Sequence, residues 1–94
     1  MKSFEFNLPV SIFKEGETFV AYTPALDIST HGDSLDEAKK QFSELVRIFI
    51  QELEQTGKTD EVLQSLGWQK VDHLWQAPIE VDHSIEPFDI PVNA

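Results

Sequence analysis

The sequence predicts a single α+β domain, in which an antiparallel sheet packs on one long helix in the order β-β-β-α-α-β. Two patterns support this fold class. The N-terminal third of the chain alternates apolar and polar side chains between turn signals, as half-buried strands do. The middle third carries an apolar stripe with the helical period. With 94 residues, of which 40% are hydrophobic, the chain is long enough for one core and too short for two.

The sheet is predicted from short alternating segments that are separated by turn residues. The expected strands cover residues 4–12, 18–23 and 26–30. Pro9 lies on the polar side of the first strand and indicates an edge or a bulge, because proline has no N–H to donate. Gly16 suits a tight turn before the second strand, and Pro24 ends that strand. Three consecutive strands of this kind predict a meander, followed by a turn over residues 31–33.

The long helix has the clearest signals in the sequence. Ser34 and Glu37 stand in the spacing of a capping box, which satisfies free amides at a helix start. Thr56-Gly57 marks the end, so the helix spans about 20 residues, roughly 30 Å. Its apolar stripe consists of Leu35, Ala38, Phe42, Leu45, Val46, Phe49 and Leu53. Ile48 lies off this stripe, either as part of a contact surface or as an ordinary exposed residue.

A short second helix is expected to begin at Thr59 and to end at Gly67. The remainder of the chain contains three prolines and no glycine, and it predicts one or two strands plus an extended tail. We therefore divide the chain into an α+β domain over residues 1–70 and a C-terminal strand or tail over residues 71–94. This last part is expected to pack on the domain or on a neighbouring chain.

One contiguous core is expected between the long helix and one face of the sheet, because these are the two largest apolar faces available. Its predicted members are Phe4, Phe6, Leu8, Val10, Phe42, Leu45, Val46 and Phe49. Trp68 and Trp75 are predicted to contribute to packing, since no basic residues flank them as in a platform for stacking bases.

The charge balance bears on the kind of partner. Seventeen acidic residues against seven lysines and arginines give a net charge of −10. Such a field repels phosphate backbones and favours a basic protein partner. The chain has no cysteine and no apolar run of membrane-spanning length, so we expect a cytoplasmic protein without direct contact to nucleic acid or membrane.

Catalytic and metal-binding patterns are weak in this sequence. The spacing of the three histidines matches no metal-ligand motif, and no metal or cofactor is expected. Asp27, Asp33 and His31 lie near a predicted strand-to-helix turn and represent a remote alternative, a small enzyme or ligand binder. Nothing places a nucleophile beside a base and an orienting group. We therefore expect a binding protein that is not an enzyme.

Two ordered motifs give the chain a family resemblance. The runs FVAYTPAL (residues 19–26) and HGDSLDEA (residues 31–38) are followed by the long amphipathic helix. Over residues 4–53 the chain resembles the HicB-type antitoxin family. The resemblance implies a degenerate RNase H-like fold, β-β-β-α followed by a further strand, without the catalytic residues of RNase H. It also implies a function, which is to neutralise a small, basic, RNA-cleaving HicA-type toxin by binding it.

The chain departs from the family pattern at two places. Many members carry a Gly-Cys pair after the leucine of the first motif, whereas Leu26 is followed here by Asp27-Ile28-Ser29. Full antitoxins append a DNA-binding domain, but the region from Trp68 onward has neither a helical period nor basic residues beyond Lys70. The chain therefore resembles the short or solitary members. An alternative is a stand-alone oligomeric interaction domain that keeps the fold without a toxin partner.

The tail is predicted to take part in assembly as a homo-oligomer. Residues 79–92 alternate apolar side chains, yet the prolines deny the tail the donor set of a central strand. The backbone hydrogen bonds of such a segment can be made with another chain, either by adding a strand to a sheet or by an arm that wraps over the neighbour. For residues 79–82, folding back as the fourth strand of the chain's own sheet stays open. The candidate partner-contact residues of the whole chain are Tyr22, Pro24, Asp27, Asp33, Ile48, Ile85, Phe88 and Ile90.

Overall fold

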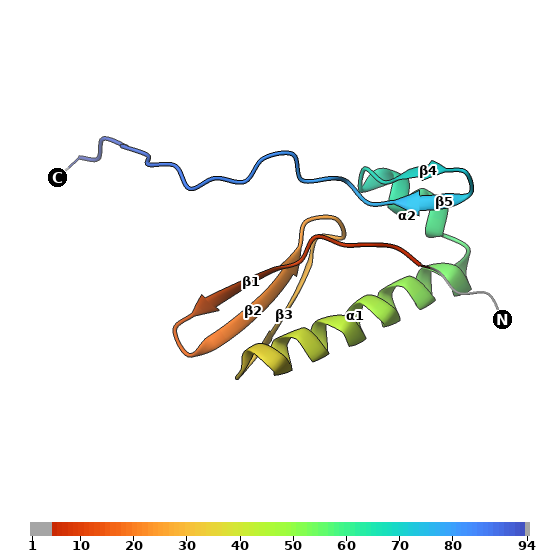
Figure 1. The fold of residues 1–94 in the computed structure, drawn as a ribbon, viewed down its shortest axis with the longest axis horizontal. Coiled ribbons are helices and arrows are strands. Elements are labelled where there is room, and N and C mark those ends of the chain that lie inside the picture. The colour runs from red at the N-terminus through yellow and green to blue at the C-terminus, as the bar shows by residue number, and fades with distance from the viewer. Residues whose placement is uncertain (1–4, 94) are drawn as a thin grey trace.

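The computed structural model describes residues 5–93 and confirms the α+β class, with a three-stranded antiparallel sheet followed by a long helix (Figure 1). The strands and helices in chain order are β1 (Ser11–Glu15), β2 (Thr18–Thr23), β3 (Ile28–Gly32), α1 (Leu35–Thr56), α2 (Thr59–Ser65), β4 (Gln69–Val71) and β5 (Leu74–Gln76). The one or two strands expected after the second helix are two and form a short hairpin, β4–β5, so the order β-β-β-α-α-β gains one strand.

The sheet has the strand order β1-β2-β3, which confirms the predicted meander. Glu15 pairs with Thr18, so Gly16 and Glu17 form a two-residue loop, and Gly16 has the positive φ (61°) that such a loop requires. The prediction of a first strand over residues 4–12 is wrong in its bounds. In the β1–β2 register Pro9 would stand opposite Pro24, and because neither has an N–H, pairing ends at Ser11.

The third strand begins two residues later than predicted. Residues 24–27 form a turn instead, in which Leu26 is buried and Asp27 adopts a left-handed backbone (φ 54°). Gly32, predicted to lie in a turn, ends β3 and pairs with Phe19. A Cβ atom at Gly32 would stand 2.8 Å from the backbone nitrogen of Ala38, so this glycine permits the close approach of β3 to α1.

Helix α1 has the predicted extent, because both of its end signals act locally. The Ser34 hydroxyl accepts a hydrogen bond from the Glu37 N–H (3.1 Å), as expected for the N-cap. At the other end Gly57 adopts the left-handed conformation (φ 69°) and closes the last turn. The helix packs mainly on β3 and then on β2. The Thr30 hydroxyl donates to the Ala38 carbonyl (3.2 Å) across this contact.

The core consists of two clusters instead of the single one predicted. The smaller contains Ala21, Ala38 and Phe42, where the first half of α1 meets the sheet. The larger surrounds the second half of α1 and consists of Ala25, Leu26, Ile50, Leu53, Leu63, Trp68 and Trp75. Ile28 and Val46 pack against both clusters and link them.

Several predicted core residues occupy other positions. Val10 is exposed, Leu45 and Phe49 are only half-buried, and Phe4 lies outside the described residues. The prediction missed Ile50, which is buried because the segment before β1 packs Phe6 and Leu8 against the larger cluster. We call this segment, residues 5–10, the leader. The leader therefore covers a part of α1 that lies outside the predicted apolar stripe.

The expected packing role of the two tryptophans is confirmed. Trp68 follows α2, donates its indole N–H to the Ala25 carbonyl (2.8 Å) and meets the Phe6 ring edge-on at 5.5 Å. Trp75 is buried from β5. The β4–β5 hairpin turns at Asp72 and His73, both of which have positive φ. This region closes the end of the sheet where the β2–β3 turn lies (Figure 1).

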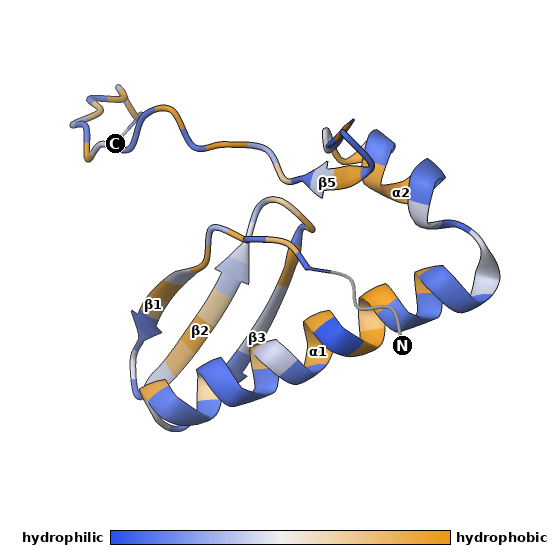
Figure 2. Cartoon of the chain, turned by 45° about the vertical axis from the view of Figure 1, so that its right-hand side comes forward, coloured by the Kyte–Doolittle hydropathy of each residue, from blue (hydrophilic) through white to orange (hydrophobic). Residues whose placement is uncertain are grey.

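The tail, residues 77–93, is an extended segment without secondary structure that projects away from the remainder of the chain (Figures 1 and 2). The radius of gyration is 16.6 Å, whereas a compact chain of this length has about 12 Å. Residues 79–82 belong to this extended segment and do not add a fourth strand to the chain's own sheet.

Candidate protein-binding surface

One face of the three-stranded sheet is covered by α1 and the other is open. Residues opposite each other in an antiparallel pair share a face, so the register defines both sides. Ala21 and Thr30 belong to the face beneath α1. Phe13, Val20 and Tyr22 therefore point to the other side, and we call this side the open face. Phe13 is 53% exposed there, and Val20 and Tyr22 are half-buried.

Tyr22 is held in place at one end of the open face. Its hydroxyl donates to the Asp27 carboxylate (3.2 Å), which the left-handed backbone of Asp27 presents from the β2–β3 turn. Partial burial, then this hydrogen bond and the negative charge of Asp27, raise the pKa of Tyr22 above its ordinary value of 10.0. Tyr22 consequently stays a neutral phenol over the physiological pH range.

Acidic residues border the apolar centre of the open face. Glu15 belongs to this face because it pairs with Thr18, and Glu17 follows in the adjoining loop. Asp27 stands at the opposite end of the sheet. Lys14 points to the other side, where its ammonium group lies 5.8 Å from the centre of the Phe19 ring. The open face thus combines two aromatic rings and a valine with three acidic residues near its two ends. By register it also holds Ser11, Thr18, Ser29 and His31.

The structure brings together only some of the predicted contact residues. Tyr22, Pro24 and Asp27 lie at one end of the sheet, and Pro24 is exposed. Asp33 follows β3 at the other end, about 20 Å from Asp27 by the rise of an extended strand. Asp27, His31 and Asp33 therefore do not form the common corner that the enzyme alternative requires.

The remaining predicted contact residues lie elsewhere. Ile48 is 49% exposed on α1, outside both core clusters. Ile85, Phe88 and Ile90 are exposed along the tail. None of these four residues belongs to the open face, so the eight candidates divide among separate surfaces.

Sequence reasoning missed Phe13 and Val20 as surface candidates. The predicted first strand ended at residue 12, which placed Phe13 next to a turn and left its direction undefined. The available signal was the alternation along the strand. Ser11, Phe13 and Glu15 share one face, and the core-facing Ile12 lies on the other. This signal becomes readable once Glu15 is known to pair with Thr18.

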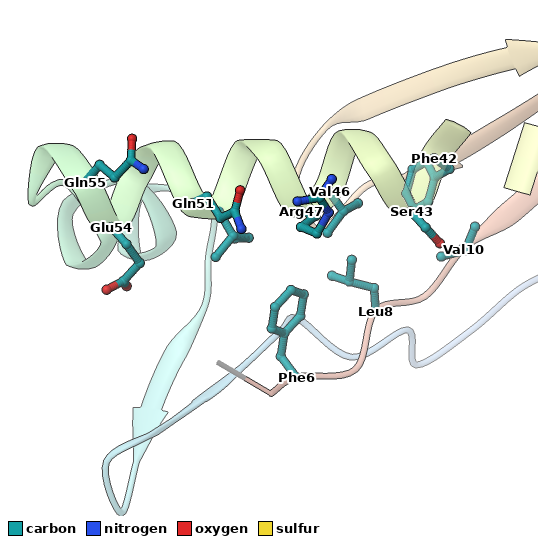
Figure 3. A pocket seen from close by; sticks show the side chains of 11 residues that line it. Phe6, Leu8, Val10, Phe42, Ser43, Val46, Arg47, Gln51, Glu54 and Gln55 are labelled. Carbon is teal, nitrogen blue, oxygen red and sulfur yellow. The ribbon is translucent and has the colours of Figure 1, made fainter. Parts of the chain in front are cut away.

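A concave surface lies between the leader and α1 (Figure 3). Phe6 and Leu8 point from the leader toward the helix, whose Val46 and Arg47 form part of the facing wall. The groove encloses about 940 Å³. It lies on the side of α1 that faces the leader, and it is separate from the open face because the sheet stands between them.

The three histidines are dispersed over the structure. His31 is exposed on β3, His73 lies in the hairpin turn, and His83 in the tail is 3.1 Å from the Glu80 carboxylate. Among residues 5–93, no group of three or more histidine or acidic side chains is placed to hold a metal ion. In the same range no helix is long and apolar enough to cross a membrane.

Comparisons of this chain with protein-family models, with curated proteins and with solved structures gave no match.

Proposed function

We propose that this chain is an antitoxin-like binding protein of the HicB type, which neutralises a small, basic, RNA-cleaving toxin of the HicA type by forming a complex with it. The observation that carries the proposal is the open face, whose apolar centre has an acidic border. Val20 and Tyr22 of this face belong to the motif FVAYTPAL on which the family resemblance rests. The β-β-β-α order is the one that a degenerate RNase H-like domain of this family has.

Electrostatics favour such a complex. A protein that cleaves RNA must present basic groups to the phosphates of its substrate. A partner with a net charge of −10 is attracted to that basic surface over several ångströms, which raises the association rate at low salt. The same charge keeps the antitoxin away from RNA itself.

The geometry of the open face suggests how binding blocks the toxin. Aromatic side chains at the centre of an interface supply much of its binding energy. Phe13 holds that position here, and Tyr22 lies beside it at the end of the face. The surrounding carboxylates then pair with lysines and arginines that would otherwise contact RNA phosphates. Inhibition by this route is competitive with RNA and needs no catalytic group on the antitoxin.

Co-expression tests the proposal. If a basic reading frame of roughly 60–90 residues adjoins the gene, we expect its product to arrest growth and this chain to relieve the arrest. Phe13→Glu should abolish the relief, because it places a charge in the apolar centre of the open face. Leu74→Glu is the matched control, since Leu74 is 65% exposed on β5, away from that face. Loss of relief by Leu74→Glu with retention by Phe13→Glu contradicts the assignment of the surface.

The exposed tail favours a second candidate function, that of a stand-alone oligomeric interaction domain. This function predicts self-association of the purified chain and no relief of toxin-induced arrest. Absence of an adjoining basic reading frame, or a neighbouring product that leaves growth unaffected, overturns the antitoxin proposal in favour of this one.

A further inference from the structure

The tail exposes apolar side chains along most of its length. Its apolar residues, with the exposed fraction of each, are Ile79 (81%), Val81 (93%), Ile85 (97%), Phe88 (84%), Ile90 (74%) and Val92 (83%). The accessible surface of the chain is 7811 Å², against about 5,500 Å² for a compact protein of this mass. The excess of about 2,300 Å² is enough for a stable protein–protein interface, which typically buries about 1,600 Å² in total.

The tail leaves its own domain after its first residues, of which Ala77 still packs against the larger cluster. Pro78 fixes its own φ and keeps Ala77 extended, so the chain continues straight from β5 and does not double back. The first tail residues lie alongside the leader, and the remainder then diverges from β1 (Figures 1 and 3). Within residues 5–93, β1 is therefore paired on its β2 side alone, and the extended tail of the same chain begins beside the leader that precedes β1.

The sequence of the tail is that of an amphipathic strand with a break. Alternation places four residues on one side, Ile79, Val81, His83 and Ile85. The other side holds Glu80, Asp82, Ser84 and Glu86. Residues 79–86 contain no proline, so every N–H in this stretch is available for pairing. Pro87 shifts the phase, after which every second residue from 88 to 92 is apolar. The strand-forming part is therefore residues 79–86.

The fold offers one receiving surface with both features that this strand needs. Within the described residues β1 pairs only with β2. Because Glu15 and Thr18 close a two-residue loop as a hydrogen-bonded pair, the backbone N–H and C=O groups of Ile12 and Lys14 point away from β2. Helix α1 packs mainly on β3 and β2, and the groove between α1 and the leader reaches Val10, the residue before β1. Side chains from a strand beside β1 would enter this groove.

Charge contributes little to this contact. The tail carries Glu80, Asp82, Glu86 and Asp89 and has no lysine or arginine. The receiving surface holds two of the chain's seven basic residues, Lys14 on β1 and Arg47 on the wall of the groove. Arg47 is paired with Glu44 on the same helix and remains about half exposed. Because Glu80, Asp82 and Glu86 point to the side opposite the groove, the contact rests on the apolar side of the strand and not on a charge pair.

We propose that the tail is an exchanged arm. Residues 79–86 of one copy pair with the free edge of β1 in a second copy, and Ile79, Val81 and Ile85 fill that copy's groove. The exchange is reciprocal and gives a closed two-fold dimer, in which each chain donates one arm and receives one. The open face of the sheet is not used, so the dimer and the proposed toxin complex are independent of each other.

Sedimentation equilibrium tests the arm itself. We expect a dimer of the 10.7-kDa chain whose dissociation constant rises about tenfold or more with Ile85→Asp, because an apolar contact is replaced by a charge. Ser84→Asp is the matched control on the polar side of the same strand, and it should leave the constant within about twofold. Both residues are exposed in the single chain, so neither variant threatens folding. A wild-type chain that stays monomeric, or equal effects of the two variants, overturns the proposal.

A spin-label experiment tests the receiving surface. The chain has no cysteine, so Ser84→Cys carries a single label. Labelled unenriched chain is mixed with unlabelled ¹⁵N chain, and only intermolecular contacts then broaden amide signals. We expect broadening at Ile12 and Lys14. Broadening that is absent from β1, or that centres on Val20 and Tyr22 of the open face, contradicts the exchange onto the β1 edge.

Discussion

The domain and the tail both contain segments of alternating apolar and polar residues, but the apolar residues are buried in the domain and exposed in the tail. In β1, Ile12 packs beneath α1. In the tail, Ile79 and Val81 follow the same alternation and stay 81% and 93% exposed. Alternation thus defines an amphipathic strand, but a covering surface decides whether it is buried. Helix α1 covers two strands of the sheet, and no described segment of the chain covers the tail. The comparison predicts large effects for substitutions in the domain and very small ones in the tail.

The largest effect is expected at Trp68, which joins the leader, the β2–β3 turn and α2. Trp68→Ala should lower the free energy of unfolding by about 3–5 kcal/mol, since it leaves a cavity and removes the hydrogen bond to the Ala25 carbonyl. Trp68→Phe keeps a ring against Phe6 and should cost less. Urea denaturation measures both changes. A Trp68→Ala domain as stable as the wild type would show that the larger cluster is not essential to the fold.

A pair of phenylalanines on α1 sharpens the comparison within the domain. Phe42 is 5% exposed, and Phe42→Ala should cost about 3–5 kcal/mol. Phe49 is half-buried at the margin of the larger cluster, so Phe49→Ala should cost clearly less. Thermal unfolding of the two variants under the same conditions gives the order. The reverse order would mean that α1 turns a different side toward the sheet.

The alkaline titration of Tyr22 probes the open face. This is the only tyrosine, so tyrosinate absorbance reports it alone. Its folded-state pKa should exceed 10.0, and Asp27→Asn should lower it because the carboxylate charge is lost. Stability from this group is fully present below the unfolded pKa and is lost as pH rises through the higher folded pKa. An unchanged pKa in the Asp27→Asn variant contradicts the assigned hydrogen bond.

The smallest effect is expected in the tail. Ile90→Ala should change the free energy of unfolding by less than about 0.5 kcal/mol when the chain is dilute enough to be monomeric, because Ile90 contacts no core residue. Denaturation at low and high protein concentration separates folding from assembly. A loss as large as that of Phe42→Ala in the dilute sample would place the tail inside the domain.

Structural features that depend on residues close together in the sequence were predictable. The ends of α1 follow from Ser34 and Gly57, which satisfy backbone groups within one turn. Strand bounds were less accessible. Strand β1 begins only after the position where Pro9 would meet Pro24, and locating that position requires the hairpin register. The open face was missed for the same reason. The burial of Ile50 depends on the leader, which lies far from it in sequence and reaches it only in the folded chain.

In these proposals the open face binds a basic partner and the tail binds a second copy of the chain, and one measurement tests both. Light scattering on the chain co-expressed with its basic partner gives the mass of the complex for three forms: the wild type, Phe13→Glu and a chain truncated after Ala77. We predict that Phe13→Glu loses the partner and keeps the dimer, whereas truncation loses the dimer and keeps the partner. If either change alone abolished both the dimer and the binding of the basic partner, the two surfaces would not be separate.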